Sequence, residues 1–305
     1  MKTIKRVIPS SKHLVSLAGN RFILPESFEY HLKDREFLHK FNFRKHKGHV
    51  PPNGDHNFRV GDQVYPILLN PDFIHEESFD KSKRKEPGRS ECIYEVSGWI
   101  QIEYFTTSYN RIIINSQGYI GNLHGQDNNF LRIGEMLKKG KCGSFVMYQH
   151  TGLWNLLGDI RYSLESISSD LQDVIDYCFQ NSFKICFYYD PQLYLSGYSM
   201  GAGATAITGG KDPRVKKMLL IAPSPEKRET LVKKWLGQYE GEVYFVHGKS
   251  DEVIPYRYSR IFSKAAVKAK KVDLLQILEC GHDFAGDKLQ KEFLNSYRRV
   301  FARKK

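Results

Sequence analysis

The chain has 305 residues, of which 41% are hydrophobic and 26% charged, and its 46 lysines and arginines outnumber 34 aspartates and glutamates to give a net charge of +12. These proportions are typical of a globular protein with a sizeable core. No stretch approaches the roughly 18 consecutive apolar residues of a membrane-spanning helix. The N-terminal segment holds basic residues without a sustained apolar run, so we expect no secretory signal.

The cysteines are scattered along the chain and form no C-x-x-C pair: they are Cys92, Cys142, Cys178, Cys186 and Cys280. An odd, scattered set predicts buried thiols in a reducing compartment, and it argues against a disulfide framework or a zinc site. We therefore expect a cytoplasmic protein, whether in its own cell or delivered into a host cytosol, with no metal and no other cofactor.

The basic residues are spread over the sequence, with short runs at 44–47 and 81–85 and a C-terminal ARKK. No zinc finger, RNP signature or basic repeat accompanies them, so no specific nucleic-acid binding is expected. A solvated basic surface explains the charge most simply. The alternatives are peripheral contact with anionic surfaces, and a nucleic-acid or membrane binder whose basic tail matters more than any pocket.

Residues 1–90 are irregular and rich in turn formers and charge, as in PPNGDHN at 51–57 and EESFDKSKRKEPGRSE at 76–91. The apolar pattern predicts an amphipathic helix over 28–41 and a short strand over 64–69. We expect an N-terminal extension or accessory subdomain, with a lid or a segment wrapped on the main domain as alternatives. Its apolar residues are expected to border the substrate pocket.

From residue 91 to 305 the pattern is regular and predicts a second, catalytic domain. Strands are predicted at 92–96, 99–105, 111–115, 144–149, 193–197, 216–221, 242–247 and 272–278, and helices at 129–139, 166–180, 200–209, 256–270 and 284–302. An opening hairpin followed by alternating strands and helices predicts the α/β class. The central sheet is expected to be mostly parallel, with helices on both faces.

The segment Gly197-Tyr198-Ser199-Met200-Gly201 matches G-x-S-x-G, between an apolar strand and a helix rich in glycine and alanine. In such a turn the strand runs sharply into the helix, so the residues two positions on either side of the serine must lack bulky side chains. The hydroxyl then stands at a helix N-terminus, which favours a developing oxyanion. Ser199 is the candidate nucleophile, and an inert serine in a tight turn is the alternative.

Two further loops carry the candidate acid and base. Asp251 follows the strand at 242–247, and His282 follows the strand at 272–278. A neutral histidine can take the serine proton, and a buried carboxylate then supports the cation that forms. The order Ser199, Asp251, His282, each just past a strand end, predicts a catalytic triad. Taken singly, His282 as a helix cap and Asp251 as an Asx-turn residue are the alternatives.

The motifs GYSMG, HGKSDEVIP and CGHDF together resemble the α/β-hydrolase superfamily, specifically its serine esterase, lipase and serine-aminopeptidase-like branch, over about residues 91–302. The resemblance implies an oxyanion hole built from the backbone N–H groups of Tyr119 and Met200. In one departure, Gln117 precedes Gly118 where the family usually has histidine and glycine.

Other titratable residues lie near these motifs. Glu252 and Asp283 rank below Asp251 as the acid, and His247 is expected to be structural. His150 follows the strand at 144–149, where a supporting role beside the site is favoured over a role as second base. The interval 222–241 fits a single helix, so no large cap is expected there.

The motifs therefore predict a serine hydrolase that cleaves a carboxylic ester or thioester through an acyl-enzyme, on a small-molecule or lipid acyl substrate. An acyltransferase or peptidase using the same triad is one alternative. A catalytically silent α/β-hydrolase-like binding protein is the other.

Overall fold

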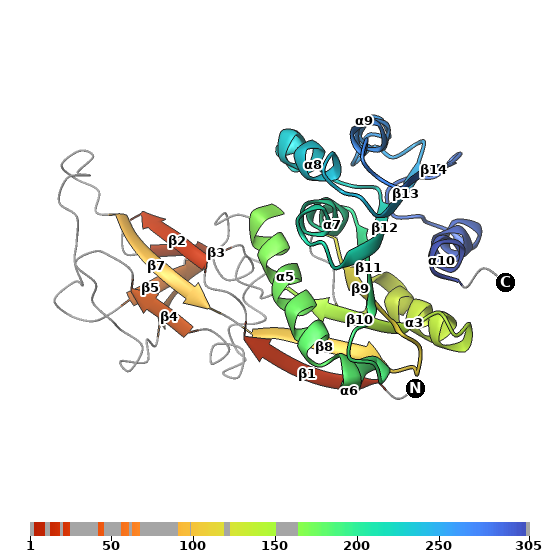
Figure 1. Cartoon of the computed structure of the whole chain (residues 1–305). Helices are drawn as coiled ribbons and strands as arrows, with labels where there is room; N and C mark the ends of the chain where they lie inside the picture. Colours follow the sequence, from red (N-terminus) through yellow and green to blue (C-terminus); the bar gives the residue numbers. More distant parts are fainter. Residues whose placement is uncertain are drawn as a thin grey trace. The chain divides into compact units, whose positions relative to one another are not determined.

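The computed structural model describes residues 3–9, 13–18, 21–24, 42–45, 56–60, 63–67, 91–97, 99–118, 123–150 and 164–302. The chain forms two compact units (Figure 1). The larger unit comprises Met1–Ile8, Gln101–Gln149 and Ser163–Lys305, and the smaller comprises Pro9–Ile100 and His150–Tyr162. This division differs from a single boundary at residue 90, because β1 near the start of the chain belongs to the larger unit and residues 150–162 are assigned to the smaller.

The smaller unit holds two three-stranded sheets. Strands β2 (His13–Ala18) and β4 (Asn42–Lys45) pair antiparallel with β7 (Glu91–Ser97). Strands β3 (Arg21–Leu24), β5 (His56–Val60) and β6 (Gln63–Ile67) form the second sheet. The strand predicted at 64–69 corresponds to β6, whereas the helix predicted at 28–41 lies outside the described residues.

The larger unit is built on one eight-stranded sheet in the order β1-β8-β10-β9-β11-β12-β13-β14. Its strands are β1 (Ile4–Pro9), β8 (Trp99–Phe105), β9 (Arg111–Ser116), β10 (Ser144–Gln149), β11 (Gln192–Tyr198), β12 (Val215–Ile221), β13 (Glu242–Gly248) and β14 (Lys271–Ile277). Neighbouring strands from β10 to β14 are parallel, and β8 is antiparallel to β10. The mostly parallel sheet is confirmed.

The expected opening hairpin is wrong. Strand β7 belongs to the smaller unit, and β8 lies beside β1 and β10 and not beside β9. Alternation of polar and apolar residues indicated where these strands are, but their partners come from distant parts of the sequence.

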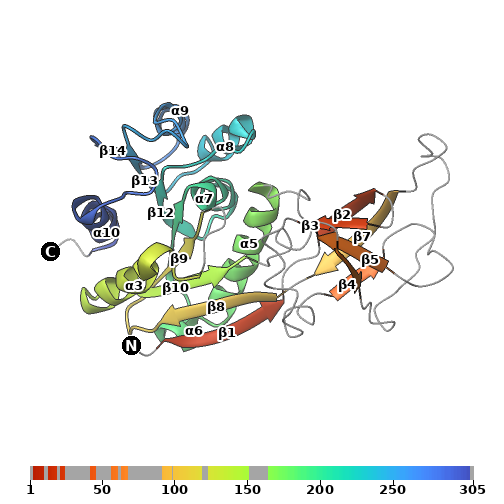
Figure 2. The ribbon, with the colours of Figure 1, turned by 180° about the vertical axis from the view of Figure 1, so that it is seen from behind.

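Helices cover both faces of the sheet (Figures 1 and 2). Helices α5 (Leu164–Gln180), α7 (Met200–Lys211), α8 (Glu229–Leu236) and α9 (Arg257–Ala265) pack in sequence as one layer, while α3 (Asn129–Lys139) packs on α10 (Asp287–Phe301). The helices predicted for residues 91–305 are all present, although α9 ends five residues early. The short helices η4 (Gln126–Asn128) and α6 (Ser182–Cys186) were not predicted.

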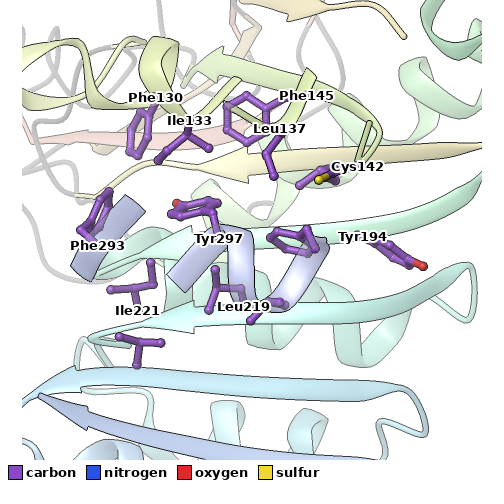
Figure 3. Close-up of a cluster of buried hydrophobic side chains, with 14 of the residues drawn as sticks. Phe130, Ile133, Leu137, Cys142, Phe145, Tyr194, Leu219, Ile221, Phe293 and Tyr297 are labelled. Carbon is purple, nitrogen blue, oxygen red and sulfur yellow. The ribbon is translucent and has the colours of Figure 1, made fainter. Parts of the chain in front are cut away.

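The α3 and α10 side of the sheet carries an aromatic-rich core (Figure 3). Phe145 of β10 meets Tyr297 of α10 edge to face, with ring centroids 6.3 Å apart. The Tyr297 hydroxyl donates a hydrogen bond of 2.8 Å to Asn115 of β9. Burying side chains of this size stabilises the fold by about 1.5–3 kcal/mol each. The last helix is therefore tied to the middle of the sheet.

The parallel strands determine where the candidate residues gather. Ser199 follows β11, Asp251 follows β13 and His282 follows β14, so all three lie at the carboxyl edge of the sheet. Between β12 and β13 the chain forms the single helix α8, as expected, so no large cap arises there. Among the described residues, no helix is long and apolar enough to cross a membrane.

Candidate active site

Ser199 occupies the sharp turn between β11 and α7. Its φ of 55° and ψ of −121° lie in a region that non-glycine residues rarely adopt, so the turn is strained. The strain is held by the backbone: the Ser199 N–H donates to the carbonyl of Ile221 at 2.9 Å, and its carbonyl accepts from the N–H of Ser224 at 3.0 Å. The neighbouring strand β12 and its loop therefore hold the serine in place.

Two glycines make this turn possible. A Cβ atom on Gly201 would lie 2.2 Å from the carbonyl oxygen of Gln117, and one on Gly197 would lie 2.5 Å from that of Gly201. Real Cβ atoms do not approach backbone oxygens so closely. The G-x-S-x-G pattern thus reflects contact between the turn and the end of β9 as much as the turn itself.

The three predicted residues form a continuous line of hydrogen bonds. His282 Nε2 lies 3.0 Å from Ser199 Oγ, and His282 Nδ1 lies 2.7 Å from Asp251 Oδ2. A carboxylate only accepts, so Nδ1 carries the proton and Nε2 is left to accept from the serine hydroxyl. Ser199 and Asp251 are buried, and His282 is partly exposed. This is the geometry in which a histidine can withdraw the serine proton.

Asp251 is held as a charged acceptor. Its Oδ1 accepts from the backbone N–H groups of Val253 and Ile254, at 3.0 and 2.7 Å, so the Asx turn that sequence offered as an alternative is present alongside the contact with His282. Burial raises the pKa of this carboxyl, but hydrogen bonds from His247, His282 and Ile254 outweigh it and hold the pKa well below its usual range. The carboxylate is therefore ionised at neutral pH.

His247 also contacts the acid, which sequence analysis missed. Its fully buried ring places Nε2 3.2 Å from Asp251 Oδ2 and 2.8 Å from the carbonyl oxygen of Ile254. A carbonyl only accepts, so Nε2 carries the proton, and Nδ1 accepts from the Ser259 hydroxyl at 2.7 Å. The spacing of four residues in HGKSD was the available signal. His247 and His282 thus both contact the same carboxylate oxygen, Oδ2 of Asp251.

The oxyanion donors implied by the resemblance are only partly described. Met200 is the first residue of α7, so its N–H is one of those a helix leaves without an internal partner. Tyr119 lies outside the described residues. Gly118 packs against the turn: a Cβ there would be 3.1 Å from Ser199 Cβ. Gln117 is buried, and neither polar atom of its side chain has a hydrogen-bond partner among the residues that the structure describes.

Comparisons with known proteins bear on the fold. No protein-family model and no curated protein matches this sequence. Among solved structures, Est1E from Butyrivibrio proteoclasticus is similar with a TM-score of 0.53 at 15% identity, over 66% of this chain and 92% of that one. Dienelactone hydrolase from Anabaena variabilis is similar with a TM-score of 0.54 at 14% identity, over 67% of this chain and 93% of that one. For esterase Pf2001 from Pyrococcus furiosus the TM-score is 0.52 at 12% identity, and the match covers 67% of this chain and 88% of that one.

Likenesses at 12–15% identity bear on the fold alone. The chain has the α/β-hydrolase fold. The predicted fold class is confirmed, and the matched two thirds of the chain equals the larger unit in size.

One residue of this α/β-hydrolase fold joins the nucleophile turn to the histidine loop. The hydroxyl of Tyr198 donates to the backbone carbonyl of His282 at 2.9 Å, and the two rings stack with centroids 5.2 Å apart. Phe293 of α10 contacts the tyrosine ring edge to face, with centroids 5.9 Å apart. Burial raises the pKa of the Tyr198 phenol well above its usual range, so it remains a donor. No sequence pattern had predicted a role for Tyr198.

Other nearby groups are separated from this line. Glu252 and Asp283 are exposed, and the carboxylate bonded to His282 is that of Asp251. Burial raises the pKa of the Cys280 thiol to about 11, which leaves it protonated and a poor nucleophile. His150 is buried at the end of β10, next to the undescribed residues 151–163. Within the described residues, no group of three or more His, Cys, Asp or Glu could hold a metal ion.

Proposed function

We propose that this protein is a serine hydrolase that cleaves a carboxylic ester or thioester through an acyl-enzyme, with Ser199 as nucleophile, His282 as base and Asp251 as acid. The observation that carries the proposal is the unbroken line of hydrogen bonds of 2.7 and 3.0 Å from Asp251 through His282 to Ser199. It ends on a strained serine at a helix N-terminus. An inert serine would not need this support.

In the first half-reaction, Ser199 Oγ attacks the acyl carbonyl carbon while its proton passes to Nε2 of His282. Negative charge moves to the carbonyl oxygen, where the N–H of Met200 and that of Tyr119 would donate hydrogen bonds. The imidazolium is stabilised by the ionised Asp251. When the tetrahedral intermediate collapses, the bond to the leaving group breaks and His282 returns its proton to the leaving oxygen or sulfur.

In the second half-reaction, water takes the place of the leaving group. It gives a proton to Nε2 of His282, and its oxygen attacks the acyl carbon. The ester bond to Ser199 then breaks, and the serine recovers the proton as the acid is released. No metal and no organic cofactor enters either step.

The substrate class is proposed as a small-molecule or lipid acyl group. Similar folds at low identity include an esterase and a dienelactone hydrolase, and Est1E has a solved structure with ferulic acid bound. An acyltransferase or peptidase would use the same three residues with a different acceptor or leaving group. The described cysteines Cys142, Cys178, Cys186 and Cys280 are buried free thiols, which supports a cytoplasmic location.

The decisive test is labelling by a fluorophosphonate probe together with turnover of p-nitrophenyl esters. Ser199→Ala should abolish labelling and lower kcat by about 10³-fold or more, because only oxyanion and binding effects remain. The matched control is Ser263→Ala, which removes a hydroxyl from the distant helix α9 and should leave both readouts unchanged. Labelling that persists at another serine in Ser199→Ala would contradict the assignment.

The same assay tests the acid. Asp251→Asn should lower kcat by about 10³–10⁴-fold, because an amide cannot support the imidazolium charge or fix the tautomer. Asp283→Asn, one residue from the histidine but exposed, should stay within about threefold of the parent. The reverse order of effects would assign the acid to Asp283.

A further inference from the structure

Four exposed aromatic side chains lie together at the edge of the sheet opposite Ser199. They are Phe183, Phe187, Tyr188 and Tyr189, with exposed fractions of 47%, 54%, 43% and 79%. They belong to α6 and the loop that leads into β11. Since Ser199 follows the end of β11, this aromatic cluster and the nucleophile lie at opposite ends of the same strand.

The aromatic cluster is ordered although it is exposed. The rings of Phe183 and Tyr189 stack at 4.7 Å, and Phe187 meets Phe183 edge-on at 6.2 Å. The Ser182 hydroxyl donates to the carbonyl of Tyr189 at 3.1 Å. The Ser144 hydroxyl at the start of β10 donates to the carbonyl of Ile185 at 2.8 Å, which fixes the segment to the sheet. Side chains of this size are normally buried, so an exposed cluster indicates a binding surface.

Basic residues gather at the same edge. Of the helices that the structure describes, α3, α6, α7, α8, α9 and α10 carry lysine or arginine in their last turn. Complementing the helix dipole accounts for those at helix ends. It does not account for lysines in loops and at strand starts. With Lys184 of α6, the exposed residues Lys141, Lys216, Lys268, Lys270 and Lys271 form what we call the basic edge.

A row of cations and rings extends across the sheet at this end. Arg111 and Lys217 lie over the ring of Tyr194 at 5.7 and 5.4 Å, and Lys217 and Lys271 lie over that of Tyr244 at 5.5 and 4.9 Å. These residues come from β9, β11, β12, β13 and β14, which are consecutive in the sheet. The rings hold the positive charges in a fixed row.

Acidic residues at this edge are few among the described residues, and several are engaged. Glu242 pairs with Lys217 at 3.2 Å, and Arg214 binds Asp212 and Asp176. Asp190 and Glu240 are exposed. At the opposite edge the loops after β13 and β14 carry Asp251, Glu252, Glu279 and Asp283 together with Lys249. Exposed lysines therefore outnumber exposed acidic residues at the strand starts, whereas the opposite edge carries both signs of charge.

We propose that the basic edge and the aromatic cluster form a docking surface for an anionic lipid bilayer. Phenylalanine and tyrosine rings partition into the headgroup region of a bilayer. Lysines around them gain from the negative potential of acidic lipids. Two signals together give membrane attachment where either alone is marginal.

The arrangement of the rings favours a bilayer over single-stranded nucleic acid. Bases bind by stacking on free aromatic faces. Here Phe183 and Tyr189 each cover one face of the other, and the cations of the basic edge are lysines, which lack the planar fork that reads phosphates and bases.

Docking through this surface determines the side from which substrate reaches Ser199; this consequence rests on the proposed function. Strand β11 has seven residues, so Ser199 is separated from the aromatic cluster by roughly 23 Å of strand. A docked molecule would hold the nucleophile on the side away from the bilayer. The acyl substrate would then arrive from the aqueous phase and not from the membrane.

The test is co-sedimentation of the full chain with vesicles of phosphatidylcholine alone or with roughly one third phosphatidylserine. We expect binding to the mixed vesicles and a loss of binding as salt rises to about 0.5 M, where charges are screened within a few ångströms. The triple variant Lys141→Glu, Lys184→Glu, Lys216→Glu should bind about tenfold or more weakly. The double variant Phe187→Ser, Tyr189→Ser should weaken binding while keeping its salt dependence.

The matched control is the triple variant Lys227→Glu, Lys249→Glu, Lys288→Glu, which changes the net charge equally but at the catalytic edge. It should bind like the parent. An equal loss in both triple variants would overturn the proposal, because net charge alone would then explain binding. Tighter binding to an oligonucleotide, weakened by the same variants, would assign the surface to nucleic acid.

Thermal unfolding checks that each variant is folded. The readout is vesicle binding, which does not depend on enzymatic activity. Ser199→Ala should bind vesicles as the parent does. Vesicle binding by a parent protein that shows no ester turnover would support the docking surface and contradict the proposed function. Ester turnover without vesicle binding would contradict the docking surface and support the proposed function.

Discussion

At the residue scale, the candidate site is a chain of groups in which each holds the next. Ser199 is held by the backbone of Ile221 and Ser224, and Asp251 is held between His247 and His282. Most of these supports are single hydrogen bonds at normal distances. Their value lies in restricting orientation, since a displacement of about 1 Å can cost 10²-fold in rate.

Tyr198 offers a test of such restriction. Tyr198→Phe removes the hydrogen bond to the His282 carbonyl but keeps the stacked ring, and should lower kcat about three- to tenfold with little change in KM. Tyr198→Leu removes both contacts and should lower kcat by roughly 30- to 100-fold. Steady-state kinetics on a soluble ester separates kcat from KM.

The matched control is Tyr194→Phe, which removes the hydroxyl of a tyrosine four residues earlier on the same strand and should leave both constants unchanged. If Tyr198→Phe instead raised KM at constant kcat, the phenol would contact the substrate and would not be a positioning residue.

At the scale of elements, the site depends on how closely β9, β11 and α7 approach one another. The end of β9 touches the nucleophile turn through the backbone of Gln117 and Gly118. Helix α7 is buried over most of its length because its residues are mostly glycine, alanine and threonine. Small side chains here allow backbone groups to face the reacting atoms.

Gly118→Val should damage catalysis without unfolding the protein. Its Cβ would lie 3.1 Å from Ser199 Cβ and 3.2 Å from Tyr198 Cδ1, so the loop that leads to the Tyr119 N–H must shift. Loss of one oxyanion donor typically costs about 10²–10³ in kcat. The measurement is ester turnover beside thermal unfolding.

Two control variants accompany Gly118→Val. Gly281→Ala adds a methyl group into open space and should retain activity within about threefold. Tyr119→Phe leaves the backbone N–H in place and should also have a modest effect. A severe loss in Tyr119→Phe would mean that the phenol itself takes part.

At the scale of the whole molecule, catalytic and structural requirements meet in Asp251. Its folded-state pKa lies below the unfolded value of about 3.9, so its contribution to stability is complete above that pH and is lost as pH falls toward the folded pKa. Hydrogen bonds to a charged group are worth about 1.5–3 kcal/mol. The variant Asp251→Asn does not titrate at this position.

The unfolding free energies of the parent and of Asp251→Asn should therefore differ by about 1–3 kcal/mol at neutral pH, and the difference should narrow below about pH 4. Urea unfolding at about pH 7, 5 and 3 measures it. A difference that widens as pH falls would mean that the carboxyl is protonated in the folded protein.

The sequence by itself indicated most strands and helices of the larger unit, although not β1, η4 or α6, and it singled out the three residues that the structure brings together. Parallel strands buried on both faces are continuous apolar runs, as in RIIINS and VKKMLLI, and they can be recognised locally. The strand-to-helix turn at Ser199 demands glycines at set positions, so it too leaves a local pattern.

Tertiary structure decided what depends on distant contacts. The pairing of β8 with β1 and β10, the second histidine on Asp251 and the bond from Tyr198 to His282 join residues by topology, and no local periodicity encodes them. The net charge of +12 was visible in the sequence, but the gathering of exposed lysines into the basic edge was not. That edge exists because parallel strands bring the ends of many separate helices and the starts of many strands to the same side of the sheet.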